Sequence, residues 1–204
     1  MARIENVGGF ILAGGASSRM GRDKAFIEME GEPLVARAAR LLEPITGKPT
    51  VIGPPERFAP LGLLAIRDDH PGFGPLDGIS TALGAATHPW NLMIGCDLPF
   101  LTQDWLEYLI RRALESQAEA VLPLNSQGAE PLCAMYHRRA GEAISAALKR
   151  GVRKITQGLA GLVIVNLAPE EWKPFDSSGL LFKNINTPDD YNQLMAAFGK
   201  KREA

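Results

Sequence analysis

The sequence has almost no net charge, and this lack excludes several classes of partner. Its 204 residues include 22 Lys and Arg against 23 Asp and Glu, which gives a net charge of -1. A protein that binds nucleic acid or an anionic membrane through its overall charge carries a marked excess of basic residues. We therefore expect neither nucleic acid nor membrane as a partner, and any phosphate-binding site has to be local.

Cysteines and long apolar runs are scarce as well. Cys96 and Cys133 lie far apart and outside a CxxC or CxxH context, which favours reduced, buried thiols over a disulfide or a metal site. The first residues, MARIENVGG, lack the apolar core of a signal peptide, and no apolar run is long enough to cross a bilayer. We expect a cytoplasmic protein.

Length and composition are those of one ordinary globular domain. The 204 residues are 46% hydrophobic and 22% charged, and no stretch of them is of low complexity. Because we find neither an internal repeat nor a linker, we expect a single domain over residues 1–204.

Short apolar runs alternate with stretches of helical periodicity along the chain. The runs that predict strands are continuous rather than alternating in polarity, which is typical of strands covered on both faces. They lie at 10–13, 49–53, 63–68, 91–97, 118–124, 132–137, 162–167 and 181–186. Helices are predicted from Pro33, over 78–86, from a Thr102 cap to Leu114, over 139–150, and from a Thr187 cap with Pro188 at the first position and Gly199 near the end.

One short link fixes the direction of one strand. The segment NSQGAEP, residues 125–131, is typical of a turn, and so short a link joins antiparallel strands. Since predicted helices separate most of the other runs, the sequence predicts an α/β three-layer sandwich with a mostly parallel sheet and one antiparallel strand. We expect the ligand crevice beyond the carboxyl ends of the strands.

The segment FILAGGASSRMGRDK, residues 10–24, follows the first predicted strand and indicates a phosphate site. Its glycines can expose backbone N–H groups to an anion, while Arg19 and Lys24 supply positive charge. A glycine-rich surface turn is the alternative, and the three cationic residues after the glycine pair argue against it. The segment matches neither GxxxxGK[ST] nor GxGxxG, so a P-loop NTPase and a nicotinamide enzyme are not supported.

Two predicted strands end in acidic residues. Asp97 ends the run NLMIGC and precedes Pro99, so its carboxylate can hold a cation such as Mg²⁺ bridged to phosphate. An Asp that merely starts a turn is the alternative. Asp68 lies in RDDHPGFGPLDGIST, residues 67–81, where it can accept a hydrogen bond from a base or ribose. In the same segment we interpret His70 as a polar turn residue rather than a metal ligand.

Other polar residues divide into candidates and ordinary residues. Asn184 and Asn186, at period two in FKNINTP, predict contacts with a polar ligand, with a strand end and helix cap as the alternative. His88 and His137 are interpreted as ordinary residues. Nucleophilic catalysis is not supported, because Ser17 and Ser18 lack a GxSxG frame.

The motifs LAGG-x3-RMG-x-DK, GPLDGI, CDLPF, EPLCAMY and FKNINTPDD occur in this order between Phe10 and Asp190. In this order the sequence resembles the molybdenum cofactor guanylyltransferases of the MobA type. The resemblance implies a Rossmann-like nucleotidyltransferase fold and an enzyme that transfers GMP from GTP to the terminal phosphate of molybdopterin, using Mg²⁺ and releasing pyrophosphate. It also implies molybdenum-insertion proteins and recipient molybdoenzymes as partners.

Site residues follow from the same resemblance, motif by motif. It implies that the guanine site is lined by Leu12, Ala13 and Gly14, and that the triphosphate is surrounded by Gly15, Arg19 and Lys24. It implies that the nucleoside pocket is completed by Asp68, Gly74, Pro75, Leu76 and Gly78, that Asp97 holds magnesium, and that Asn184 and Asn186 face the pterin. Lys24, Arg19 and Asp97 would carry the catalysis. Gly53 stands where family members can carry a nucleotide-binding asparagine.

Three alternatives stay open. The acceptor or base could differ, as in a molybdopterin cytidylyltransferase or a sugar- or alditol-phosphate nucleotidyltransferase. By the family resemblance, LAGG with GPLDG favours guanine, whereas cytosine users tend to carry LAAG. A nucleotide-binding protein without turnover is the third alternative, and Lys24 and Asp97 argue against it.

Overall fold

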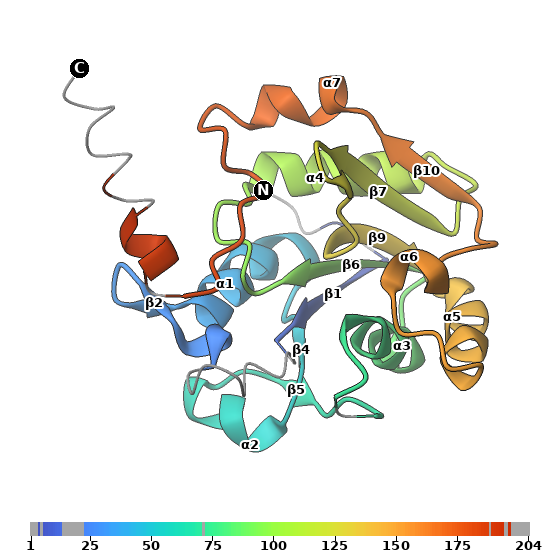
Figure 1. Cartoon of the computed structure of the whole chain (residues 1–204), viewed down its shortest axis with the longest axis horizontal. Helices are drawn as coiled ribbons and strands as arrows, with labels where there is room; N and C mark the ends of the chain where they lie inside the picture. The colour runs from blue at the N-terminus through green and yellow to red at the C-terminus, as the bar shows by residue number, and fades with distance from the viewer. Residues whose placement is uncertain are drawn as a thin grey trace.

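A mostly parallel sheet forms the centre of the computed structural model, which describes residues 4, 6–13, 23–70, 72–187, 189–193 and 196. Among these residues, eight strands form one sheet in the order β10-β7-β9-β6-β1-β4-β5, with β8 paired to β7 (Figure 1). The strands are β1 (Val7–Leu12), β4 (Thr50–Ile52), β5 (Ala65–Ile66), β6 (Trp90–Gly95), β7 (Ala120–Asn125), β8 (Gly128–Ala129), β9 (Cys133–His137) and β10 (Ile164–Leu167).

Strand directions confirm the predicted sheet. β1 runs parallel to β4 and β6, β4 to β5, and β7 to β10. β9 is antiparallel to both of its neighbours, β6 and β7, as the short link at 125–131 predicts. That link also contains β8, which the sequence analysis did not predict.

Helices cover both faces of the sheet, as a three-layer sandwich requires. One face packs against α1 (Leu34–Thr46) and α4 (Gln103–Leu114), the other against α3 (Pro75–Ala85) and α5 (Ala140–Lys149), which lie side by side (Figure 1). Short helices α2 (Pro55–Phe58), α6 (Ile155–Gly158) and α7 (Pro169–Trp172) lie in the connections. No helix in the described part of the chain combines the length and apolarity needed to span a membrane.

Local sequence explains where these helices begin. Thr102 caps α4 as predicted, because its Oγ1 accepts a hydrogen bond from the Trp105 N–H at 3.4 Å. Pro75 occupies the first turn of α3, where its missing N–H costs nothing, so this helix begins three residues before the predicted Gly78. The predicted Thr187 cap is also confirmed, since Thr187 Oγ1 accepts from the Asp190 N–H at 3.0 Å. The predicted Pro188 and Gly199 positions lie outside the described residues.

β1 begins at Val7, three residues before the predicted Phe10. The prediction was short because Gly8 and Gly9, in the first half of the strand, do not look like strand residues. Gly9 lies so close to α1 that a Cβ atom there would stand 2.2 Å from Thr46 Oγ1. Close packing of the strand against the helix therefore requires glycine, whose low strand propensity misleads a sequence-based assignment.

The strand predicted at 181–186 is wrong, since these residues form a turn and an irregular segment outside the sheet. Asp176 Oδ1 accepts the N–H groups of Leu180 and Leu181, at 2.9 and 3.1 Å, and this fixes the turn. Leu181 and Ile185 are both fully buried, so their apolar character serves packing against the core rather than strand pairing.

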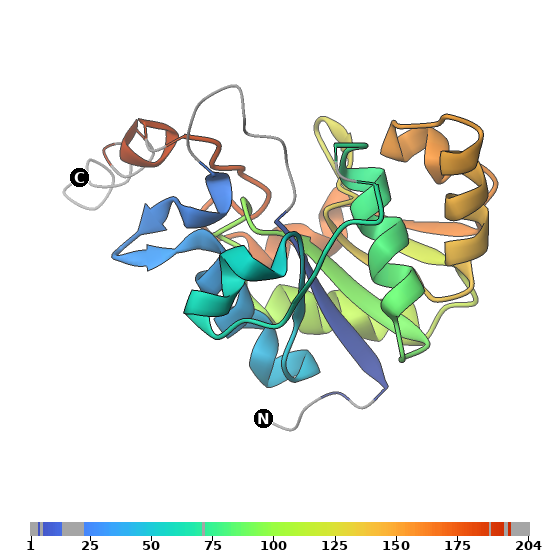
Figure 2. The same cartoon turned by 90° about the horizontal axis from the view of Figure 1, so that it is seen from below.

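A small satellite core holds the C-terminal segment in place. Strands β2 (Glu28–Met29) and β3 (Glu32–Pro33) form a separate antiparallel hairpin. Residues from this hairpin and α1 enclose Ile185, with Phe100 and Tyr191 packed against them. Figure 2 shows the helical residues 189–193 and the hairpin at the same end of the molecule.

Candidate active site

Three strands end level at one edge of the sheet, and predicted site residues follow two of them. The register pairs Leu12 of β1 with both Ile52 of β4 and Gly95 of β6. Two further hydrogen bonds extend the alignment: the Ala13 N–H donates to Ile52 O, and the Cys96 N–H donates to Leu12 O, each at 3.2 Å. This is the carboxyl edge at which ligands of parallel sheets bind. Gly14, Gly15 and Arg19 lie outside the described residues.

Lys24, Asp97 and Asn186 come together from distant parts of the sequence. Lys24 begins a 3-10 helix, η2 (Lys24–Phe26), that Asp23 caps by accepting the Ala25 N–H at 3.2 Å. Lys24 Nζ donates to Asn186 Oδ1 and lies 3.9 Å from Asp97 Oδ2. The cluster therefore joins one cation, one carboxylate and one amide at the carboxyl edge.

The Asp97 carboxylate lies just beyond β6 in a largely buried position. Its side chain is 17% exposed, and burial raises its pKa, while the nearby Lys24 ammonium partly opposes this. A Cβ atom on Gly95 would lie 2.6 Å from Asp97 Oδ1. Glycine at this position therefore leaves the space that the carboxylate occupies at the end of the strand. The Asp97 carbonyl accepts the Ile185 N–H at 2.9 Å, which ties the C-terminal segment to the site.

The oxygen atoms of this cluster suit a hard divalent cation. Asp97 offers carboxylate oxygens, and Asn186 offers an amide oxygen that already accepts from a cation. Within the described ranges, no group of three or more His, Cys, Asp or Glu side chains converges. A cation here would therefore take most of its ligands from phosphates and water, which is how Mg²⁺ is commonly bound.

Leu12, Asp68 and Gly78 form a second group beside the first. A Cβ atom on Gly78 would lie 3.0 Å from Leu12 Cδ2 and 3.6 Å from Asp68 Oδ1. Asp68 is half-buried, and burial, followed by the Asp77 charge, raises its pKa. The group is small, partly apolar and carries one acceptor, which suits a nucleoside.

The segment Gly74–Leu76 contributes backbone rather than side chains. Gly74 precedes α3 with φ at 87°, a conformation that glycine adopts without strain, and its carbonyl accepts the Asp77 N–H at 3.1 Å. Leu76 is fully buried and packs under Gly158, so its side chain belongs to the core. Pro75 is exposed.

Asp77 organises the loop before α3, a role that the sequence analysis missed. The buried carboxylate accepts the His70 N–H through Oδ2 and contacts His70 Nδ1 through Oδ1, both at 2.9 Å. His70 stacks on Phe73 at 5.2 Å, and Arg153 lies 3.9 Å from the centre of the Phe73 ring. His70 is thus a loop residue, as expected, and an acid in the first turn of a helix was the available signal.

Glu130 is a second residue that the sequence analysis did not single out. It precedes the reversed strand β9 and therefore lies at the same edge as Asp97. Burial raises its pKa, and the Asp97 charge raises it further. Asn125 Nδ2 donates to Glu130 Oε2 at 3.4 Å.

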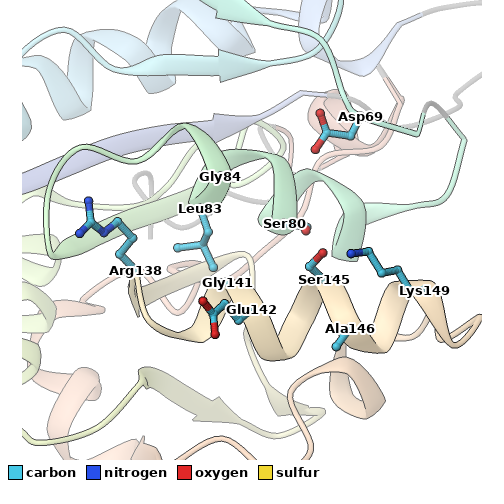
Figure 3. Close-up of a pocket in the computed structure, with 10 residues that line it drawn as sticks. All are labelled: Asp69, Ser80, Leu83, Gly84, Arg138, Gly141, Glu142, Ser145, Ala146 and Lys149. Carbon is cyan, nitrogen blue, oxygen red and sulfur yellow. The ribbon is translucent and has the colours of Figure 1, made fainter.

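A cavity of about 450 Å³ lies between α3 and α5, apart from this cluster. In Figure 3, Leu83 points from α3 toward Gly141 of α5, and Ser80 and Ser145 face the same gap. Asp69, which follows Asp68 of the nucleoside group in the sequence, also lines the cavity, and its N–H donates to Thr81 Oγ1 on α3 at 3.0 Å. None of the predicted site residues in the described part of the chain lines it.

Comparisons with known proteins identify the family. The family model described as "MobA-like NTP transferase domain" matches residues 9–163. A Clostridium perfringens protein named "Probable molybdenum cofactor guanylyltransferase" is 31% identical over 196 residues, covering 95% of this chain and 96% of that protein. One of the same name from Pelotomaculum thermopropionicum is 33% identical over 184 residues, covering 89% and 88%.

Solved structures show the same fold. Molybdopterin-guanine dinucleotide biosynthesis protein A from Archaeoglobus fulgidus superposes with a TM-score of 0.81 at 27% identity, covering 95% of this chain and 99% of that one. The 2-C-methyl-D-erythritol 4-phosphate cytidylyltransferase of Thermus thermophilus has a TM-score of 0.65 at 15% identity, covering 92% and 96%, and so shares the fold alone. Since the family model spans most of the chain and relatives match it over nearly its whole length, the protein belongs to the MobA-like NTP transferase family.

Proposed function

We propose that the protein transfers GMP from GTP to the phosphate of molybdopterin, releasing pyrophosphate and forming molybdopterin guanine dinucleotide. The main support is the meeting of Lys24, Asp97 and Asn186 at the carboxyl edge of the sheet. It occurs in a chain whose relatives, 31% identical over 95% of its length, are named molybdenum cofactor guanylyltransferases.

The reaction is an in-line displacement at the α-phosphorus of GTP. A phosphate oxygen of molybdopterin forms a bond to this phosphorus, while the bond to the bridging oxygen breaks and its electron pair leaves with pyrophosphate. A phosphate monoester is largely ionised at neutral pH, so the nucleophile needs no general base. The chain then has to position the two substrates and offset their negative charge.

Lys24 is the described cation best placed for this task. Its ammonium group lies between an amide and a carboxylate that hold it at the site. We assign the triphosphate to Lys24 together with Arg19 and Gly15.

We propose Mg²⁺ as the cofactor, with Asp97 as its ligand from the protein. When bound, the ion would neutralise charge on the phosphate oxygens. Asp97 is suited to it because its carboxylate is largely buried and faces one lysine, so a second positive charge relieves an incompletely paired anion.

The nucleoside of GTP and the acceptor are assigned to different groups of residues. We assign the nucleoside to Leu12, Ala13, Gly14, Asp68 and the segment from Gly74 to Gly78, and the acceptor side to Asn184 and Asn186. Both asparagines are exposed, with buried Ile185 between them, so both are accessible to a substrate. Guanine is favoured over cytosine by the names of the relatives and by the LAGG and GPLDG motifs.

The cytoplasm is the compartment that fits the cysteines. Cys96 and Cys133 are unpaired and buried, and burial raises the pKa of Cys96 to about 12, which keeps it a protonated thiol. Such thiols suit a reducing compartment.

A pyrophosphate-release assay tests the proposed function. Purified protein with Mg²⁺ and molybdopterin is supplied with GTP, CTP or ATP, and the dinucleotide product is identified by mass. We expect release with GTP and a clear preference over the other two. Preferred release with CTP would establish a cytidylyltransferase, and nucleotide binding without release in any pair would establish a binding protein.

A further inference from the structure

We propose that a second cavity, formed by the β7–β8 turn, α7 and residues 173–183, binds the flat heteroaromatic head of the acceptor. The inference rests on the proposed function and adds a binding site to it. The cavity has a volume of about 360 Å³, within the range of about 300–1,000 Å³ typical of small-molecule sites.

Aromatic and amide groups give this cavity the chemistry that a pterin-like ring requires. Trp172 and Phe182 line it and contact each other edge to face, with centroids 5.0 Å apart. The Trp172 indole N–H donates to Leu124 O at 2.7 Å, which fixes the ring. Gln127 also lines the cavity, and its side-chain amide can donate to and accept from the edge of a heterocycle, whereas the Asn125 amide is already engaged with Glu130 and with the Gln127 N–H.

Two lysines make the cavity suited to an anionic ligand. Lys173 and Lys183 are exposed and line it together with a single acidic residue, Asp176. The Asp176 carboxylate is already engaged, because one of its oxygens accepts two backbone N–H groups of the following turn. The positive charge of the two lysines is therefore available to anionic groups, such as thiolates, that lie beside the ring of a ligand.

Two short paths connect the cavity to Asp97. Asn125 lines the cavity and donates to Glu130, and two residues after Glu130 the Leu132 carbonyl accepts the N–H of Gly95, which lies two residues before Asp97. Lys183 also lines the cavity, and two residues later the Ile185 N–H donates to the Asp97 carbonyl.

The second path is short enough for the proposed acceptor to span it. Three residue steps, from Lys183 to Asn186, span at most about 10 Å. A bicyclic ring with a short phosphorylated side chain can bridge a distance of this order. An acceptor with its head in the cavity can thus present its phosphate beside Lys24.

The test uses the double charge reversal Lys173→Glu with Lys183→Glu, two exposed positions whose replacement leaves the core intact. A matched control reverses two other exposed lysines, Lys48→Glu with Lys149→Glu, of which Lys149 lines the α3–α5 cavity. We expect the first pair to raise the KM for molybdopterin about tenfold or more, as loss of charged hydrogen-bond donors does. The Kd for GTP and the melting temperature should stay unchanged, and the control pair should behave as wild type.

A second measurement does not depend on turnover. Binding of 6-hydroxymethylpterin is followed by quenching of tryptophan fluorescence, with Trp172→Phe identifying the reporting ring. Quenching in wild type that is lost in Trp172→Phe supports the site. Quenching that persists in Trp172→Phe, or its absence in wild type, overturns it, as does an unchanged KM in the first lysine pair. Failure of wild type to form any dinucleotide would instead refute the proposed function, while the pterin measurement would still decide on the cavity.

Discussion

Gly78→Ala should weaken nucleotide binding with little change in stability, because the added methyl group enters the space between Leu12 and Asp68. Its Cβ would lie 3.0 Å from Leu12 Cδ2, the end of a flexible side chain, and 3.6 Å from Asp68 Oδ1. Replacing an interior helix glycine by alanine gains about 1 kcal/mol. Moving the Leu12 side chain by a few tenths of an ångström costs less than the roughly 1–3 kcal/mol of a full overpacking.

These two effects largely cancel, so the melting temperature of Gly78→Ala should stay within about 4 °C of wild type. One misplaced methyl group in a close-fitting pocket costs roughly 10–200-fold in discrimination. We therefore expect the Kd for GTP to rise about tenfold or more, as measured by isothermal titration calorimetry.

Gly84→Ala is the matched control, since Gly84 lies in the same helix and a Cβ atom there meets nothing within 4 Å. It should gain stability from helix propensity and bind GTP like wild type. If Gly78→Ala binds GTP as tightly as Gly84→Ala does, the nucleoside does not lie over Gly78, and the assignment of Leu12 and Asp68 loses its support.

Three further predictions concern charge and ligand identity. Lys24→Ala should lower turnover about 100-fold or more, as removal of one preorganised transition-state donor does; near-normal turnover would place this cation outside the reaction. Asp97→Asn should abolish most turnover, with partial recovery at raised Mg²⁺. Because burial raises the Asp97 pKa, metal-free wild type should lose stability relative to this variant as pH rises above about 4, and the two unfolding curves should converge at lower pH; a variant less stable at pH 7 would contradict this. GTP with Mg²⁺ should raise the melting temperature more than CTP or ATP, and equal shifts would refute guanine selectivity.

The sheet and its Asp97 end could be predicted because their signals are local. β6 is buried along its whole length and is apolar except for Asn91, and Asp97, two residues before a proline, marks its end. The reversed β9 followed from one short link. β1 was predicted three residues short, because Gly8 and Gly9 are selected by contact with neighbouring elements and carry no strand signal of their own.

The supporting residues of the site could not be predicted, because their roles arise from tertiary contacts. Asp77 acquires its role when the loop folds back and brings His70 within hydrogen-bonding distance. Glu130 matters because β9 is reversed, which brings the start of a strand to the edge where the parallel strands end. Neither the spacing nor the periodicity of residues in the sequence predicts such tertiary contacts.

The irregular segment that replaces the predicted strand at 181–186 has a consequence for how the two substrates meet. In a strand, the backbone N–H and C=O groups of these residues would have been hydrogen-bonded to a neighbouring strand. Instead, Asp176 holds the turn, Ile185 is buried in the satellite core and bonds to the Asp97 carbonyl, and Asn186 accepts from Lys24. A single segment therefore lines the proposed acceptor cavity at Lys183 and contacts both charged residues of the proposed donor site. The same few residues thus contact both the proposed acceptor cavity and the proposed donor site. The acceptor phosphate and the α-phosphate of GTP can therefore be brought together without a separate domain that closes over them.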